Sequence, residues 1–173
     1  MKSDRLNLGS GKNIKEGYLN LDSAKLPGVD IVWDLNKHPW PIKSNSFGEI
    51  YISHVLEHLD DLIKCLEEIH RISKKDAKII IKVPIFPSIY SANDPTHKHF
   101  FTYFTFEYFE PNAHYDYYSK AKFKIVKRKI NFSWNRYLKW ISFFVNLSPR
   151  FYSRYLSFIF PSNELYIELK TIK

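Results

Sequence analysis

Residues 47–84 hold the pattern that most constrains the fold of this chain. Two apolar stretches, "GEIYISHV" and "AKIIIKVP", flank the segment "LDDLIKCLEEIHRISKKD". Near-continuous apolarity is typical of strands that are covered on both faces of a parallel sheet. The middle segment has apolar residues at helical spacing, namely Leu62, Ile63, Leu66, Ile69 and Ile72. This spacing indicates a helix packed on a sheet, so the sequence predicts a strand, helix, strand unit of an α/β protein.

Further short strands are predicted on both sides of this unit. The earlier ones are "RLNLG", "GYLNLD" and "VDIVWD", and the later ones are "FKIVKRKINF" and "ELYIELKTIK". Residues 11–18 and 22–29 are too few for the crossover helix that normally joins parallel strands. We therefore expect a single α/β domain over residues 1–173, with reduced early helices.

Residues 133–161 are expected to form an aromatic helical insertion before the last strand, in two helical pieces separated at Pro149. Five apolar residues of the first piece recur at helical spacing: Trp134, Tyr137, Leu138, Ile141 and Phe144. This pattern favours a helix that covers the thinly covered part of the sheet. A partner subunit, such as a second copy in a homodimer, or a membrane surface would be alternative covers.

Charged and aromatic residues are unevenly distributed along the chain. Residues 1–110 carry 14 Lys and Arg against 15 Asp and Glu, whereas residues 111–173 carry 12 against 3. Of the 30 Phe, Trp and Tyr residues, 22 lie between Phe100 and Phe160. A basic and aromatic second part suggests phosphate-bearing, nucleic-acid or membrane-surface partners. The same lysines could simply keep an aromatic surface soluble.

The remaining composition is that expected of a cytoplasmic protein. No run of residues is long and apolar enough to cross a membrane, and the first residues lack the basic-then-apolar order of a secretion signal. The single cysteine, Cys65, cannot form an internal disulfide. Its place in the predicted helix indicates an ordinary helix residue rather than a nucleophile.

A glycine turn follows the first predicted strand, in "LNLGSGKNIKEGYLNLD". Gly9 and Gly11 leave backbone N–H groups open to a ligand. Asp22 ends the next strand, where a carboxylate can accept hydrogen bonds from both ribose hydroxyls. The dinucleotide fingerprint G-x-G-x-x-G fails at Ile14, and the phosphate-binding motif G-x-x-x-x-G-K-[ST] fails at Asn13. The pattern therefore favours a nucleoside ligand without phosphates.

Four segments taken in order resemble the motifs of class I S-adenosylmethionine-dependent methyltransferases, specifically the type 11 group. They are "LNLGSG", "GYLNLD", "WDLNKHPWPIKSNSFGEIYISHVLEHL" and "PSNELYIELK", and the resemblance is weakest between about Lys120 and Pro161. It implies a Rossmann-like sheet, mostly parallel with an antiparallel last strand, and S-adenosylmethionine as the cofactor. It also implies methyl transfer to an acceptor such as a small molecule, a sugar or a lipid-linked glycan.

The resemblance assigns the first part of the cofactor site to the glycine turn. Gly9, Ser10 and Gly11 would line the methionine part of the cofactor, and Asp22 would bind the ribose. The structural alternative is that the glycines only permit a tight turn and that Asp22 caps a short helix. Asn7 departs from the family, which has an acidic residue at this position.

The second part of the site lies after the third and fourth strands. By similarity, Asp34 and Leu35 match the "D-L" that meets the adenine edge, although Asp34 could instead make a side-chain turn. His54, at the end of the fourth strand, borders the place where the transferred methyl group points. Gly48 replaces an aspartate of the family pattern, which weakens one local match and does not touch the cofactor.

Methyl transfer from a sulfonium mainly requires alignment of a nucleophile and exclusion of water. A base is needed only when the acceptor must lose a proton. His54 is the first candidate, followed by His97 and His99 in "DPTHKHFFTYFTFEYF", whose "DPTH" opening resembles the family's substrate loop. His54 could instead be a hydrogen-bonded residue at the strand end, and His58 is expected on a helix surface.

The segment "HVLEH" also matches the zinc-peptidase pattern H-x-x-E-H, and His97 and His99 could add ligands. That chemistry needs His54 and His58 on one face of one helix. Since His54 is expected at the strand end, and cofactor motifs flank the segment, we predict no metal in this site.

Two alternatives to a soluble small-molecule enzyme stay open. The chain could be a non-catalytic methyltransferase-like domain that binds nucleic acid or a protein partner through its basic, aromatic C-terminal part. It could also be a methyltransferase at a membrane face, with aromatic residues inserted beside lysines and arginines.

Overall fold

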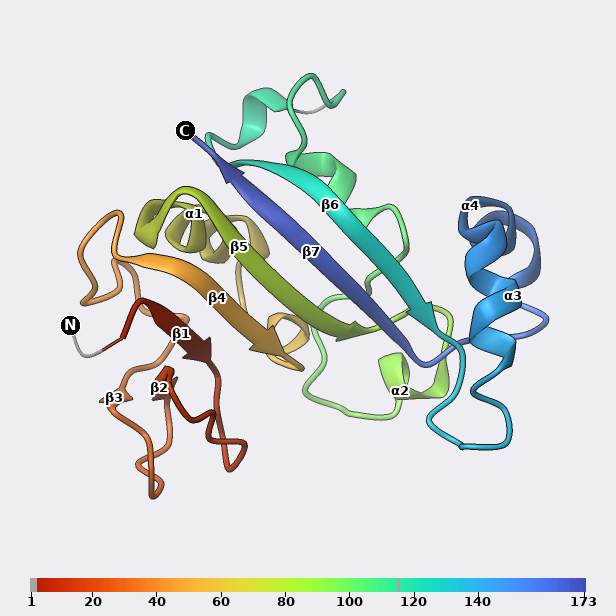
Figure 1. Cartoon of the computed structure of the whole chain (residues 1–173), viewed down its shortest axis with the longest axis horizontal. Coiled ribbons are helices and arrows are strands. Elements are labelled where there is room, and N and C mark those ends of the chain that lie inside the picture. Colours follow the sequence, from red (N-terminus) through yellow and green to blue (C-terminus); the bar gives the residue numbers. More distant parts are fainter. Residues whose placement is uncertain (1–2, 115) are drawn as a thin grey trace.

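The computed structural model describes residues 3–114 and 116–173, which form one seven-stranded sheet in the order β3-β2-β1-β4-β5-β7-β6 (Figure 1). The strands are β1 (Arg5–Leu8), β2 (Leu19–Asp22), β3 (Ile31–Val32), β4 (Phe47–Ser53), β5 (Ser73–Pro84), β6 (Lys122–Asn131) and β7 (Glu164–Ile172). Strands β1 to β5 are parallel, and β7 is antiparallel to both of its neighbours, β5 and β6. The predicted Rossmann-like sheet is therefore confirmed.

The helices are short apart from the one in the predicted strand, helix, strand unit. They are α1 (Leu62–Ile72), α2 (Ile89–Ala92), α3 (Ile141–Leu147) and α4 (Pro149–Phe151), with 3₁₀ turns at Leu56–His58, Thr105–Phe109 and Asp116–Tyr118 and a π-helical turn at Tyr152–Leu156. Helix α1 begins where the Asp61 side chain accepts a hydrogen bond from the Lys64 N–H at 3.0 Å.

Helix α1 buries one face against the sheet, as its spacing predicts. Cys65, Leu66 and Ile69 are buried, whereas Ile63 is 37% exposed and lies outside the packed face. Burial raises the pKa of the Cys65 thiol, so this cysteine is an inert core residue as predicted. Strand β5 starts directly after the helix at Ser73, which is earlier than the predicted stretch "AKIIIKVP".

The early connections contain no helix in the described part of the chain, as their lengths predict. Side-chain hydrogen bonds hold them instead. The Asn7 amide donates to the Asn13 carbonyl at 3.0 Å and to the Asn20 side chain at 2.9 Å. The Asp30 carboxylate accepts from the Asn20 N–H at 2.8 Å. Buried polar contacts therefore take the place of helical packing at this edge of the sheet.

The aromatic insertion does form helical pieces that meet at Pro149, but it does not cover the thin part of the sheet. Helix α3 packs beside β6, at the opposite edge of the sheet from β2 and β3 (Figure 1). The Asn146 side chain fixes it there, because it accepts from the Ile130 N–H at 2.9 Å and donates to the Ile130 carbonyl at 2.7 Å.

The predicted packing face of this insertion is largely exposed, so that prediction is wrong. Four of its five residues are exposed, namely Trp134 (51%), Tyr137 (72%), Leu138 (42%) and Phe144 (59%). Ile141 packs against the core, and Val145 is buried. Trp134, Tyr137 and Leu138 precede α3 in bends and turns, so the helical spacing also placed the start of this helix too early.

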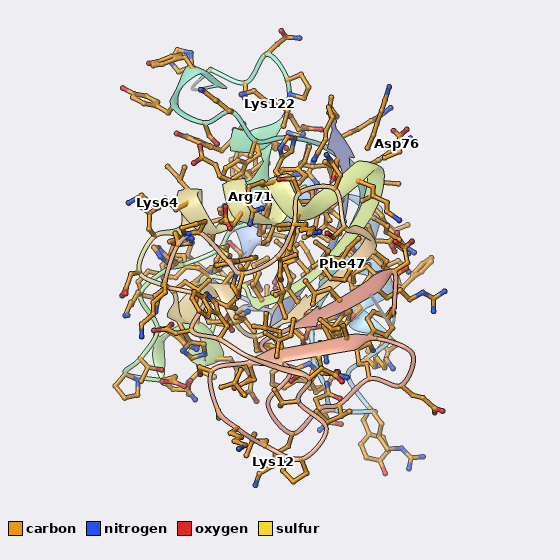
Figure 2. The ribbon with its side chains drawn as sticks, turned by 90° about the vertical axis from the view of Figure 1, so that its left-hand side faces the viewer. Lys12, Phe47, Lys64, Arg71, Asp76 and Lys122 are labelled. Atoms are coloured by element: carbon orange, nitrogen blue, oxygen red, sulfur yellow. The ribbon has the colours of Figure 1, made fainter. Side chains whose placement is uncertain are left out.

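The hydrophobic core lies between α1, the central strands and the loop after β5. Figure 2 shows Phe47 in the interior, while Lys12 and Asp76 lie toward opposite ends of the molecule. Lys12 follows β1 and Asp76 is near the start of β5, so these two ends are the carboxyl and amino edges of the parallel strands. Within the described residues, no helix is long and apolar enough to cross a membrane.

Candidate active site

The carboxyl ends of the parallel strands surround a cavity of about 390 Å³. Six of the predicted cofactor residues line it: Gly9, Gly11, Asp22, Asp34, Leu35 and His54. They come from the ends of β1, β2 and β4 and from the loop after β3, which are adjacent in the sheet. These predicted residues therefore line one cavity, at the edge where ligands bind in open α/β sheets.

The glycine turn needs glycine for two different reasons. Gly9 has a φ of 62°, and a Cβ atom there would lie 2.3 Å from a Val55 methyl carbon. Gly11 has a φ of 49°, and a Cβ atom there would meet no protein atom within 4 Å. Because Gly11 lines the cavity, a side chain at this position would take up space that a ligand could use.

Ser10 is the one predicted cofactor residue that does not line the cavity. Its side chain is buried, and its hydroxyl has no hydrogen-bond partner. Its backbone N–H donates to the Leu21 carbonyl at 3.0 Å, which ties the glycine turn to β2. The contact of Ser10 with the cofactor stays a prediction.

The Asp22 carboxylate holds the turn and faces the cavity at the same time. One oxygen accepts from the Gly11 N–H at 2.7 Å, and the other accepts from the Ala24 N–H at 2.9 Å. A carboxylate offers about four acceptor sites, so each oxygen can still accept a hydroxyl. The alternative that Asp22 caps a short helix is wrong, because no helix directly follows Asp22 in the described residues, and the ribose-binding role stays a prediction.

Asp34 and Leu35 lie at the next corner of the cavity. The Asp34 carboxylate accepts from the Asn36 N–H at 3.0 Å. Asp34 therefore makes the side-chain turn that was the alternative to a contact with adenine. Trp33 also lines the cavity, and its indole N–H donates to the Lys37 carbonyl at 3.0 Å. Sequence reasoning missed Trp33, although an aromatic residue directly before "D-L" was an available signal.

His54 follows β4 in a left-handed backbone conformation, with a φ of 55°. Both ring nitrogens face buried carboxylates: Nε2 lies 3.1 Å from a Glu164 oxygen, and Nδ1 lies 3.3 Å from a Glu57 oxygen. The hydrogen bond to Glu164, followed by the ion-pair contact with Glu57, raises the pKa of His54 to about 9. With both nitrogens engaged, the predicted role of His54 as a base lacks a free lone pair.

The other histidines differ from their predicted places. His58, expected on a helix surface, is half-buried and lines the cavity, so that expectation is wrong. His58 is the last residue of the 3₁₀ turn Leu56–His58. This turn follows the left-handed backbone of His54, and it places the His58 side chain at the cavity. His97 lies against His58, with ring centroids 4.7 Å apart. His99 Nε2 is 2.9 Å from the Leu59 carbonyl oxygen, and His99 does not line the cavity.

Comparison with protein families gives one match. Residues 7–81 match the model of a family described as a methyltransferase domain. This part of the chain is therefore similar to a methyltransferase domain. The resemblance to class I methyltransferases of the type 11 group is thereby confirmed, and S-adenosylmethionine is the cofactor that this family implies. Comparison with curated proteins gives no significant match.

Solved structures with similar folds cover nearly the whole chain. An S-adenosylmethionine-dependent methyltransferase from Mesorhizobium loti has 14% identity, covers 96% of this chain and 89% of its own, and has a TM-score of 0.59. A SAM-dependent methyltransferase from Archaeoglobus fulgidus has 20% identity, coverages of 96% and 85%, and a TM-score of 0.58. The [4+2]-cyclase SpnF has 12% identity, coverages of 97% and 74%, and a TM-score of 0.60. At such identities these matches concern the fold alone.

Proposed function

We propose that this protein transfers the methyl group of S-adenosylmethionine to an acceptor bound beside the cavity. The observation that carries the proposal is the convergence of the glycine turn, Asp22 and the loop after β3 on one cavity. This arrangement suits an adenosine ligand without phosphates, because it offers a carboxylate for the ribose and no phosphate-binding loop.

The residues present fit S-adenosylmethionine. The open space beside Gly11 accommodates the ligand backbone, and the Asp22 carboxylate keeps unused acceptor sites toward the cavity. Trp33 offers an indole ring and Leu35 an apolar side chain where the adenine is expected. Asn7, which replaces the acidic residue of the family, is buried and holds Asn13 and Asn20, so it acts on the loop rather than on the ligand.

The bound cofactor would supply an activated methyl group on a sulfonium that already carries its leaving group. The chain's own residues would bind and orient this group and exclude water from it. Asp22 and Leu35 would hold the adenosine. His54 would border the methyl group as a hydrogen-bonded cation between Glu57 and Glu164, and would position the acceptor. His97 and His99 stay candidates as bases only where the acceptor must lose a proton.

The acceptor that the surface favours is one carried by a lipid, presented at an anionic membrane. The aromatic surface, defined as Trp140, Phe143, Phe144, Phe151, Tyr155 and Phe158, has side chains that are 53–75% exposed. An apolar groove of about 410 Å³ lies between α3 and α4. Singly exposed apolar residues are common on proteins, but a group of exposed aromatic rings beside an apolar groove is typical of an interaction site.

The positive charge around the aromatic surface favours an anionic partner. Residues 132–163 contain four Lys and Arg and no Asp or Glu. Arg136, Lys139 and Arg154 are exposed, while Arg150 bonds the Glu107 carboxylate at 2.7 Å. Exposed aromatic rings beside cations are the features that bind the headgroup region of anionic bilayers.

Trp134, which precedes the aromatic surface in the chain, lies at the rim of the candidate site. The Trp134 ring lies 6.4 Å from the His54 ring and 4.5 Å from the Tyr90 ring, between centroids. Phe158 contacts Phe86, after β5, at 5.8 Å. An acceptor held by the membrane could therefore extend its head group toward the methyl group without leaving the bilayer.

Calorimetry with S-adenosylmethionine and S-adenosylhomocysteine tests the methyltransferase proposal. We expect the wild type to bind both, and Asp22→Ala to weaken binding by about 1–3 kcal/mol, the range for leaving polar partners unpaired. Asp30→Ala is the matched control, since Asp30 also accepts a backbone N–H and does not line the cavity. Equal affinities for Asp22→Ala and the wild type would contradict the role of Asp22.

Sedimentation with vesicles tests the proposal that the protein binds its acceptor at an anionic membrane. The wild type should sediment with vesicles containing phosphatidylserine and stay in solution with phosphatidylcholine alone. The pair Phe143→Ser and Phe158→Ser should abolish sedimentation, whereas Val126→Ser, an exposed apolar residue of β6, should not. Absence of vesicle binding together with a dimer in analytical ultracentrifugation would assign the surface to a second copy instead.

The non-catalytic alternative is a nucleic-acid-binding domain, favoured only by the basic and aromatic composition of residues 111–173. Binding of this kind falls steeply with salt concentration. Tight, salt-sensitive RNA or DNA binding without affinity for S-adenosylmethionine would replace the enzyme proposal.

A further inference from the structure

Three chemically reactive side chains converge beside the cavity. They are Glu57 and His58 of the 3₁₀ turn after β4, and His97 of the loop after α2. One potential ligand atom from each lies within 4.8 Å of the other two. The loop is fixed to the turn by its backbone, since the Lys98 N–H donates to the Glu57 carbonyl at 2.7 Å.

The hydrogen bonds of both histidines leave Nε2 as the atom with a lone pair. His97 Nδ1 lies 3.1 Å from the Ser91 carbonyl oxygen, which can only accept, so Nδ1 carries the proton. His58 Nδ1 lies 2.8 Å from the Thr96 hydroxyl, whose own proton goes to the Asp94 carboxylate at 2.7 Å. His58 Nδ1 therefore donates as well. Histidine ligands of metals are normally oriented by such a hydrogen bond from the other ring nitrogen.

The third group, Glu57, is a buried carboxylate whose hydrogen-bonding capacity is unused. Its side chain is 1% exposed, and neither oxygen has a hydrogen-bond partner. The His54 ring nitrogen lies 3.3 Å from one oxygen, without the alignment of a hydrogen bond. Among the described residues His54 is its one ion-pair partner, and a bound cation would satisfy the oxygens that accept no hydrogen bond.

We propose that Glu57, His58 and His97 bind a divalent first-row transition-metal ion, with Zn²⁺ as the reference ion. Two imidazole nitrogens and one carboxylate are a common donor set for such ions. Three protein ligands leave a position open for water or for an oxygen of the acceptor. This revises the prediction that the site holds no metal. The ligand set also differs from H-x-x-E-H, because His54 precedes the turn and faces Glu164 instead.

The open position would give the ion a part in catalysis, an extension that rests on the proposed methyl transfer. His58 lines the cavity, so the ion would lie at its rim. An acceptor hydroxyl bound to the ion loses its proton to solvent more readily. Its oxygen would then form the bond to the methyl carbon as the carbon–sulfur bond breaks, and the electron pair of that bond would stay on sulfur.

Metal titration of the full chain, freed of metal with a chelator and assayed without S-adenosylmethionine, tests the site. Calorimetry with ZnCl₂ and visible absorption with CoCl₂ should show one ion bound. Glu57→Gln and His97→Ala should each weaken binding at least 100-fold. Thr96→Val, which removes the acceptor for His58 Nδ1 together with the hydroxyl's bond to Asp94, should weaken it about 10-fold, as loss of such a supporting group does.

Two controls separate binding from folding. His38→Gln, an exposed histidine outside the cluster, should bind as the wild type does. Circular dichroism should show that Glu57→Gln and His97→Ala are folded, and Zn²⁺ should raise the Tm of the wild type and not of these variants. The proposal is overturned if the wild type binds none of the ions, or if both variants bind like the wild type. Neither result would bear on the affinity for S-adenosylmethionine.

Discussion

The polar cavity and the aromatic surface lie beside the same sheet, but they are held in place very differently. Around the cavity, backbone and side-chain hydrogen bonds fix Asp22, Asp34 and His54 before any ligand arrives. In the aromatic surface, large rings such as Phe143 and Phe158 are exposed at 65% and 75%. The first arrangement suits a small polar ligand that needs fixed partners. The second is stable in water only at a cost that a covering partner would remove.

The largest expected difference between the two kinds of region is in stability. Phe47 is fully buried and Phe143 is 65% exposed, so the same substitution tests both. Phe47→Ala should lower the free energy of unfolding by about 3–5 kcal/mol, and Phe143→Ala should change it by less than about 0.5 kcal/mol. Urea denaturation followed by circular dichroism measures both values. A large loss for Phe143→Ala would mean that the aromatic surface is part of the core.

Substitutions at glycines of positive φ should cause the next largest loss of stability. Gly9→Ala and Gly17→Ala both place a Cβ at positive φ, which costs about 1–3 kcal/mol. Only Gly9→Ala also clashes with Val55, which should add about 1–3 kcal/mol. Denaturation curves compare the two variants, and calorimetry should show weaker S-adenosylmethionine binding for Gly9→Ala alone. Equal behaviour would show that Val55 moves aside freely.

Replacing one tryptophan in each region should impair the binding of a different ligand. Trp33→Ala should weaken S-adenosylmethionine binding by about 1–3 kcal/mol, the range for loss of a ring stacked on a base, and should leave vesicle binding unchanged. Trp140→Ala, with its ring 62% exposed, should do the opposite. Calorimetry and vesicle sedimentation of both variants give four results. Any variant that impairs both ligands would show that the regions are coupled.

The smallest expected effect is a pH-dependent change in stability at Glu68 of α1, outside both regions. Glu68 accepts from the Trp40 N–H at 2.7 Å and bonds Arg71, and these contacts hold the pKa of Glu68 below its ordinary value of 4.5 against the effect of burial. A lowered pKa stabilises the fold at neutral pH, and this contribution is lost as the pH falls through the folded-state pKa. Glu68→Gln should therefore be less stable than the wild type at pH 7.

At a pH below the folded-state pKa of Glu68, the two proteins should unfold at the same denaturant concentration. A difference that persists under acid conditions would assign the effect to packing.

The sheet could be predicted because its information is local. Each strand has its own apolar pattern, and the glycine turn and Asp22 lie at strand ends that a parallel sheet brings together. His58 was misplaced because its exposure to the cavity depends on a backbone turn that follows the positive φ of His54, whereas Trp33 was missed although it directly precedes "D-L". The contact between His58 and His97 joins distant loops, and no spacing in the sequence reveals it.

The central claim is tested most directly by a crystal structure of the protein with S-adenosylhomocysteine at saturating concentration. We expect both ribose hydroxyls on the Asp22 carboxylate, the adenine beside Trp33 and Leu35, and the amino acid part along Gly9 and Gly11. Density for the ligand at another place, or a cavity without ligand at saturation, would contradict it.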